Sequence, residues 1–294
     1  RQLFATLGCA NCHQMQKAPK EGRPSAPDLA RLTEAKGCLS SQPGKAPRYA
    51  LSDAQRTALA AALKAPIPEG APKAEDLIAR TFHAFNCYAC HERGKVGGRE
   101  EDFNAFFTTT QPEMGDEGRL PPALDGVGAK LTAAYMKHIL ANGANDRPYM
   151  HTRMPRFGEA NVGLLQDAFA AVDKLEPVAK VTFGQAPAQV KSQGRHMVGA
   201  TALGCIKCHT FAGQKAEGVQ GIDMAIMTAR VQRDWFHRYL ADPNKFRPGT
   251  RMPTAWPMGL SVLPKVLDGD PLKQIEAIYL YLADGKKALL PLGL

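Results

Sequence analysis

Apolar residues recur at intervals of three and four positions along most of this chain, which is the spacing of amphipathic helices. The pattern predicts helices over residues 52–64, 74–85, 131–141, 161–175, 188–203, 231–241 and 271–283. The first opens on Ser52 with Gln55 three residues later, a capping-box pattern, and Gly143 follows the third as an expected C-cap. Few segments alternate apolar and polar residues as strands do, so we expect an all-α fold.

Two proline-rich segments, residues 65–72 and 180–187, interrupt the helical pattern. Proline has no backbone N–H to donate in a helix or central strand, so both segments are expected to be extended connectors. They divide the 294-residue chain into three units, residues 1–66, 74–178 and 185–294, which fit the usual size range of small domains. The expected architecture is therefore three tandem helical domains.

An internal repeat links the second and third units. The matching segments are residues 131–140 with 231–240, 147–148 with 247–248, and 152–155 with 250–253. The first two pairs keep an offset of 100 residues, and the last pair is the tetrad Thr-Arg-Met-Pro in both units. Such self-similarity indicates a duplication, which the first unit does not share.

A Cys-x-x-Cys-His pentapeptide occurs three times, once in each unit. This motif is typical of covalent haem attachment, in which both sulfurs bond the porphyrin as thioethers and the histidine ligates the iron. The predicted attachment residues are Cys9, Cys12, Cys87, Cys90, Cys205 and Cys208, and the predicted iron ligands are His13, His91 and His209. We therefore expect three covalently bound haem c groups, each with its iron.

Two other readings of the paired cysteines are weaker. A thioredoxin-type site would follow a strand, and no strand-like run precedes any copy. A structural zinc site would bring two Cys pairs close together, whereas these pairs lie far apart in the chain. The motifs use six of the seven cysteines and leave only Cys38, so no pair remains for a structural disulfide.

The repeated Thr-Arg-Met-Pro tetrads predict Met154 and Met252 as the second axial ligands of the second and third haems. A thioether ligand stabilises Fe(II) and raises the reduction potential. Most methionines are packing residues, however, and His151 is a rival ligand for the second haem. We assign the remaining methionines to packing, namely Met114, Met136, Met150, Met197, Met224, Met227 and Met258, and the histidines of the helical runs to the surface or the core, namely His83, His138, His196 and His237.

The first haem lacks an equivalent methionine. Cys38 lies 25 residues after His13, where the other units carry their Met, and Gly37 before it would let the backbone approach the porphyrin. A thiolate ligand would lower the potential of this haem. One alternative is that Cys38 is a buried free thiol. The others are a lysine or a side chain from another domain as the second ligand, or an open site.

The ring nitrogen of each proximal histidine that does not face the iron needs an acceptor, which fixes the orientation of the ring. The backbone carbonyls of Pro27 and Pro122, which follow the first two motifs, are candidates. The third unit has no matching proline, and residues 221–223 are expected to substitute.

With these motifs, the three units resemble class I c-type cytochrome domains. The resemblance implies compact helical domains around each haem, haem attachment after export to the bacterial periplasm or another extracytoplasmic location, and electron transfer. A His/Cys haem is also similar to the reactive centre of thiosulfate dehydrogenases. The leading hypothesis is therefore an electron carrier, the alternative is a sulfur-compound oxidoreductase reacting at the first haem, and a third is a haem sensor with an open iron position.

Composition and charge bear on partners. The net charge is +9, which six haem propionates would reduce to roughly +3, so we expect a redox partner with an acidic docking surface. Lys and Arg are scattered rather than gathered in a stripe, so we interpret most of them as solvated surface and expect no nucleic-acid binding. No run of 18 apolar residues predicts a membrane span, and the start at Arg1 suggests a processed segment, or the haem-bearing part of a longer polypeptide.

Overall fold

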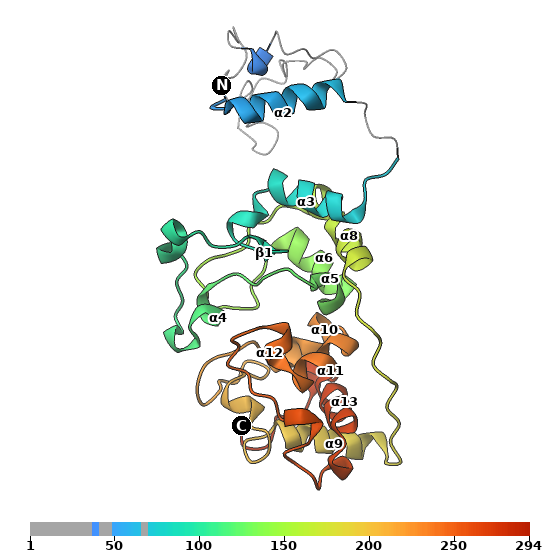
Figure 1. Ribbon diagram of the computed structural model, residues 1–294. Helices are drawn as coiled ribbons and strands as arrows, with labels where there is room; N and C mark the ends of the chain where they lie inside the picture. Colours follow the sequence, from blue (N-terminus) through green and yellow to red (C-terminus); the bar gives the residue numbers. More distant parts are fainter. Residues whose placement is uncertain (1–36, 41–48, 66–69) are drawn as a thin grey trace, which may run out of the picture. The chain divides into compact units, whose positions relative to one another are not determined.

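The computed structural model describes residues 37–40, 49–65 and 70–294, which form a mostly helical chain (Figure 1). The strands among these residues are two short ones that pair antiparallel, β1 (Glu92–Arg93) and β2 (Val96–Gly97). The all-α prediction is thus confirmed. No helix within the described ranges combines the length and the apolar character that crossing a membrane requires.

The chain divides into two compact units, Arg1–Ala71 and Pro72–Leu294. This boundary lies within the first predicted connector. We refer to residues 72–178 and 179–294 as the first and second halves of the larger unit. The division of the chain into three haem domains stays a prediction.

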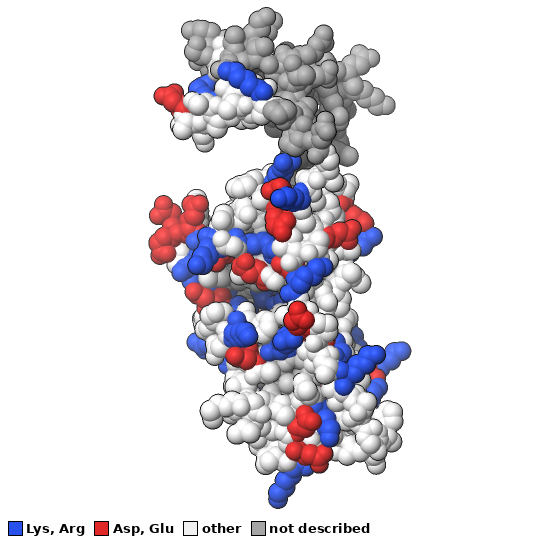
Figure 2. Space-filling model, turned by 45° about the vertical axis from the view of Figure 1, so that its right-hand side comes forward, with Lys and Arg blue, Asp and Glu red and all other residues white. Residues whose placement is uncertain are grey.

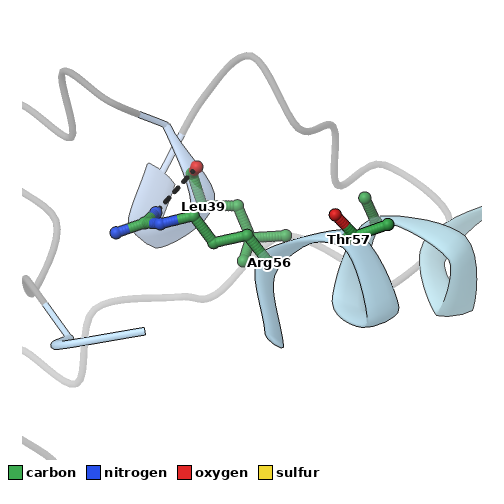
Figure 3. Close-up of a pocket in the computed structure, with 4 residues that line it drawn as sticks. Leu39, Arg56 and Thr57 are labelled. Atoms are coloured by element: carbon green, nitrogen blue, oxygen red, sulfur yellow. Dashed lines mark hydrogen bonds between the residues drawn. The ribbon is translucent and has the colours of Figure 1, made fainter. Parts of the chain in front are cut away.

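In the smaller unit the described elements are η3 (Gly37–Leu39) and α2 (Asp53–Lys64). The predicted capping box of α2 is confirmed: Ser52 Oγ accepts from the Gln55 N–H at 3.2 Å, and the Ser52 N–H donates to Gln55 Oε1 at 2.8 Å. Arg56 Nη1 donates to the Leu39 carbonyl at 3.1 Å beside a small pocket (Figure 3). This hydrogen bond holds the 3₁₀ turn that contains Cys38 against α2.

The first half of the larger unit packs α3 (Ala74–Ala84) and α5 (Val127–Lys130) against α8 (Leu165–Val172). Phe82 and Phe169 meet edge to face in its core, with ring centroids 5.9 Å apart. The remaining elements are η4 (Cys87–Ala89), η5 (Glu101–Phe106), η6 (Pro112–Met114), α4 (Asp116–Arg119), α6 (Ala133–Asn142) and α7 (Glu159–Val162).

The second half repeats this arrangement with α9 (Pro187–Val198) packed on α13 (Pro271–Leu282). The crossing of these two helices is close at Gly194, where a Cβ atom would lie 2.1 Å from the Ala277 carbonyl oxygen. The remaining elements are η7 (Cys205–Lys207), η8 (Met224–Ile226), α10 (Met227–Arg230), α11 (Arg233–Ala241), α12 (Pro243–Phe246), η9 (Pro257–Gly259), η10 (Leu267–Gly269) and η11 (Gly285–Lys287).

The predicted helices are present with two differences. The helix expected over residues 161–175 is two helices, α7 and α8, separated at Gly163, which caps the first. The helix expected over residues 188–203 ends at Val198, because the backbone becomes extended at Gly199 with ψ 167°. Gly199 also packs closely, since a Cβ there would lie 2.7 Å from the Leu292 carbonyl oxygen. Periodicity alone shows neither interruption, since both depend on packing.

The two halves meet through equivalent residues of the duplication. Leu131 and Val231 form an isolated antiparallel bridge, flanked by hydrogen bonds from Thr132 N to Arg230 O, 3.0 Å, and from Gln232 N to Lys130 O, 2.8 Å. Each half thus gives the other the same pair of backbone contacts. This reciprocity is the signature of a local two-fold axis, as in an isologous dimer.

The second connector is extended, as predicted, and the residues just before it are held by α11. Val178 N donates to Asp234 Oδ1 at 3.1 Å, and the Arg238 guanidinium donates to the Glu176 carbonyl at 2.8 Å. Pro187 belongs to the first turn of α9 rather than to the connector, because a proline costs no hydrogen bond there.

Asp173 joins three segments of the first half and generates a stability prediction. Its carboxylate pairs with Arg93 at 2.7 Å and accepts the Gly128 N–H at 2.8 Å. The Asp173 side chain is 7% exposed and that of Arg93 is 14% exposed. Asp173→Ala would leave the Arg93 charge buried and unpaired, so we expect a loss of about 3 kcal/mol in the free energy of unfolding, measured by urea titration.

Lys137→Ala is the matched control for this prediction. Lys137 and Glu159 also form an ion pair, at 2.8 Å, but their side chains are 59% and 58% exposed. Solvent screens such a pair, so its loss is expected to leave the free energy of unfolding unchanged within the error of the urea titration. Equal effects of the two substitutions would refute the structural role of Asp173.

Candidate haem sites

The Cys-x-x-Cys-His motifs of the larger unit adopt the same backbone conformation. Each begins after a residue in the left-handed region, Asn86 with φ 52° and Gly204 with φ 68°, and continues as a single 3₁₀ turn. The hydrogen bonds that close the turns run from His91 N to Cys87 O, 2.9 Å, and from His209 N to Cys205 O, 3.0 Å. The two copies therefore present their cysteines and histidine with the same spacing.

Both histidine rings are held by a backbone carbonyl. Nδ1 of His91 lies 2.7 Å from the Pro122 carbonyl oxygen, and Nδ1 of His209 lies 2.8 Å from that of Ile222. The predicted acceptor Pro122 is confirmed, and Ile222 lies in the segment expected to replace it. A carbonyl can only accept, so Nδ1 carries the proton and the lone pair is on Nε2. No hydrogen bond among the described residues occupies Nε2 of either ring.

Close-packed glycines adjoin both motifs. A Cβ at Gly221 would lie 2.5 Å from the Cys208 carbonyl oxygen and 3.2 Å from Nδ1 of His209. In the first half, a Cβ at Gly97 would lie 2.7 Å from the His91 carbonyl oxygen. Only a residue without a side chain lets these segments approach the motifs so closely.

Burial favours the neutral forms of five side chains of the two motifs. Burial lowers the pKa of both His91 and His209 below the usual value, despite the hydrogen bonds that oppose the shift. Burial also raises the pKa of Cys87 and Cys90, and that of Cys205 to about 11. The neutral imidazole is the form in which histidine binds a metal.

These residues fit a haem better than a bare metal ion. The four cysteines of the two motifs are unpaired, and among the described residues no three His, Cys, Asp or Glu side chains form a group that could hold an ion. A haem iron takes four ligands from its porphyrin and needs only one or two from the chain. A histidine with an oriented ring beside two free thiols meets that need.

Met154 and Met252 follow their motifs at equivalent places, after α6 and α11. Met154 is partly buried against the apolar core, and the turn that carries it lies against Gly143, where a Cβ would be 2.6 Å from the Met154 carbonyl oxygen. Met252 is also partly buried, and its N–H donates to Thr250 Oγ1 at 3.2 Å. Gly143 ends α6 as predicted. Iron ligation by either methionine stays a prediction.

The rival histidines have other contacts. His151 is exposed and Nδ1 lies 2.8 Å from Thr108 Oγ1, while His138 is exposed on α6. His237 is buried, and its Nε2 lies 2.5 Å from Glu276 Oε2. Packing roles are confirmed for the buried Met136, Met150, Met197 and Met224, and for Met227, which is partly buried against the apolar core. The packing assignment of Met258 is wrong, because this side chain, in η9 of the second half, is 95% exposed.

The residues proposed for the first haem lie mostly outside the described residues. Cys9, Cys12 and His13 fall there, as does Pro27. The backbone of Cys38 belongs to η3, after Gly37 with φ 80°, whereas its side chain is not among the described ones. Gly37 is therefore in the left-handed region, where a glycine is favoured.

Charged residues near the histidines were missed by the sequence analysis. Arg147 is close enough to His91 for its charge to lower the pKa of that ring, and Glu117 of the first half acts on His209 of the second. The repeat of Arg147 at Arg247 was visible in the sequence, but scattered basic residues were interpreted as surface. Their proximity to the motifs is a tertiary feature.

The larger unit thus holds two equivalent turns, each with two free thiols and one oriented histidine. No family model, no curated protein and no solved structure matches this chain. The assignment of these sites therefore rests on the residues and their geometry.

Proposed function

We propose that the chain is a trihaem c-type cytochrome that transfers electrons, with a class I cytochrome c-like domain around each haem. The observation that carries the proposal is the shared geometry of the two described motifs, in which a carbonyl holds Nδ1 of the histidine and leaves Nε2 available. Haem supplies an iron that alternates between Fe(III) and Fe(II), and so accepts or donates one electron at a time.

The chain's own residues would hold each haem from two sides. The cysteine pairs of the motifs anchor the porphyrin covalently, and His91 and His209 ligate the iron through Nε2. Met154 and Met252 would each offer a thioether to an iron, which would favour Fe(II) and a higher potential. Pro122 and Ile222 keep each imidazole in one orientation through their carbonyls.

The first haem would be attached at Cys9 and Cys12, with His13 and Cys38 as axial ligands. A thiolate at Cys38 lowers the potential of this haem relative to the other two. The chain would then offer a graded path for electrons. Attachment of haem c implies a periplasmic or otherwise extracytoplasmic location in a bacterium. The positive net charge favours a redox partner with an acidic docking surface.

The alternative function is oxidation of a sulfur compound at the first haem. It depends on Cys38 alone. Anaerobic addition of thiosulfate or sulfite separates the two functions, because an enzyme of this kind would reduce its own haems and an electron carrier would leave them oxidised.

The haem content is the first prediction of the proposed function. A pyridine haemochrome assay on protein matured by an exporting host is expected to find three haems per chain. Cys205→Ala with Cys208→Ala removes both thioethers of one motif, so the content is expected to fall to two. Cys38→Ala is the control and keeps three, because Cys38 attaches no haem. A wild-type content below three would refute the proposal.

The second prediction concerns the methionine ligands. Met154→Ala and Met252→Ala each remove one axial thioether, so each variant is expected to convert one haem from low to high spin, as seen in the electronic absorption and EPR spectra. Met258→Ala is the matched control, since this 95% exposed side chain lies in the same half as Met252. Low-spin spectra in both variants would exclude these two residues as ligands.

The third prediction concerns Cys38. In Cys38→Ala the low-temperature EPR signal of the thiolate-ligated haem is expected to disappear, and the lowest of the three midpoint potentials is expected to rise or that haem to become high-spin. Haem content and the signals of the other two haems should stay the same. An EPR spectrum identical to wild type would show that Cys38 is not a ligand.

A further inference from the structure

Four cations gather where the two halves of the larger unit meet, and they are two pairs of repeat-equivalent residues, Lys130 with Arg230 and Arg147 with Arg247. Figure 2 shows Lys and Arg side chains over the middle of this unit. The four charges act on one another, since the other three cations each contribute to lowering the pKa of Lys130. We call these four residues the axial cations.

Their aromatic contacts obey the same two-fold relation. Lys130 Nζ lies 4.5 Å from the ring centroid of Trp235 in the opposite half, and Arg230 Cζ lies 5.8 Å from that of Tyr135. Tyr135 and Trp235 are themselves equivalent in the repeat. The axial cations are thus a consequence of how the duplicated halves associate.

Carboxylates break this symmetry. Arg230 Nε pairs with Asp146 Oδ2 at 2.9 Å, and Arg247 Nε pairs with Glu117 Oε1 at 2.9 Å. For Lys130 and Arg147, no carboxylate of the described residues lies within ion-pairing distance. Half of the cluster is neutralised and half is not.

The sequence explains why the ion pair of Arg230 with Asp146 has no equivalent at Lys130. The two-fold counterpart of the Arg230–Asp146 pair would join Lys130 to residue 246, which is a phenylalanine. Phe246 packs edge to face on Trp235, with centroids 5.9 Å apart, instead of offering an anion. Arg147 likewise forms no ion pair among the described residues that is equivalent to the pair of Arg247 with Glu117, which lies in the short helix α4 of the first half.

Two unpaired cations in this position are costly. Burial, followed by the charges of neighbouring arginines, lowers the pKa of Lys130 well below its usual value and that of Arg147 to about 10. A negatively charged group bound between the two cations would offset both the cost of their burial and the repulsion by the neighbouring arginines. A planar carboxylate suits the forked donors of an arginine and the point charge of a lysine.

Resting on the proposed function, we propose that Lys130 and Arg147 bind a propionate carboxylate of the second haem, the one that His91 would ligate. Arg147 lies in the loop that leads from α6 to Met154, and Arg153 Nη1 of the Met154 tetrad donates to the Arg147 carbonyl at 3.4 Å, so Arg147 adjoins a residue proposed for the second haem. The arginine of the Met154 tetrad is less suited, because the Arg153 guanidinium already donates to the Pro148 carbonyl at 3.1 Å and to that of Met150.

The test is the midpoint potential of each haem in the holoprotein. Arg147→Gln and Lys130→Met each remove a positive charge that offsets the propionate, so Fe(III) is favoured at the second haem. The reduction equilibrium constant of that haem is expected to fall roughly tenfold, which is about 59 mV for one electron. The midpoint potential of the second haem is identified as the one that shifts in Met154→Ala.

Two variants serve as controls. Arg147→Lys keeps the charge and is expected to keep the potential of the second haem near that of wild type. Lys286→Gln removes one exposed positive charge of η11, outside the cluster, and is expected to leave all three potentials unchanged. If Arg147→Gln does not fold or does not incorporate haem, Lys130→Met decides alone.

The outcomes separate this inference from the proposed function. If wild type carries three haems and neither Arg147→Gln nor Lys130→Met shifts the second potential more than Lys286→Gln does, the inference is wrong and the cytochrome assignment stands. If wild type lacks a haem at Cys87 and Cys90, both are wrong. A shift of the wild-type second potential on replacing chloride by inorganic phosphate at constant ionic strength, absent in Arg147→Gln, would show a site for free oxyanions and also overturn the inference.

Discussion

An imidazole ring coordinates a metal ion through one of its two nitrogens. The ring keeps one orientation toward the metal when the other nitrogen makes a hydrogen bond. Both described histidines meet this constraint with a single hydrogen bond to a backbone carbonyl. The two halves satisfy it differently. In the first, Leu124 N bonds to Glu92 O at 2.8 Å and so brings Pro122 beside the motif. In the second, Gly221 N bonds to Cys208 O at 2.8 Å and presents Ile222.

The duplicated halves explain both the regularity and the asymmetry of the larger unit. Its main helices occur in a matching order, α3, α5, α6 and α8 in the first half and α9, α10, α11 and α13 in the second, and the axis between Leu131 and Val231 brings equivalent residues face to face. Any charge at such an axis meets its own copy, so a duplicated cation is necessarily close to a like charge. Asp146 and Glu117 relieve this repulsion on one side only. Divergence after the duplication has therefore made the two sites electrostatically different.

Local features of this fold were predictable from the sequence, whereas features made by distant segments were not. The capping box at Ser52, the C-cap at Gly143 and the acceptor Pro122 follow from residue types at short spacing, and all three are present. Ile222 could be placed only within a segment, because every residue has a carbonyl and the sequence does not distinguish one from the next. The buried contact between His237 and Glu276 joins α11 to α13, and helical periodicity cannot reveal such a partner. The charges of the axial cations were counted correctly but placed on the surface, since only the association of the halves brings them together.

Among the described residues, no carboxylate balances the charge of Lys130 or of Arg147. The stacking of Lys130 on Trp235 is worth about 2 kcal/mol when it is desolvated, while taking a cation out of water costs several kcal/mol even after relaxation. A protein can tolerate that difference if the group that compensates it arrives with a cofactor rather than with the chain. Folding of the larger unit and insertion of its haems would then be coupled, as metal binding and folding are in small metal-binding domains. On this view Lys130 and Arg147 are part of the proposed haem site, which the apolar core alone does not complete.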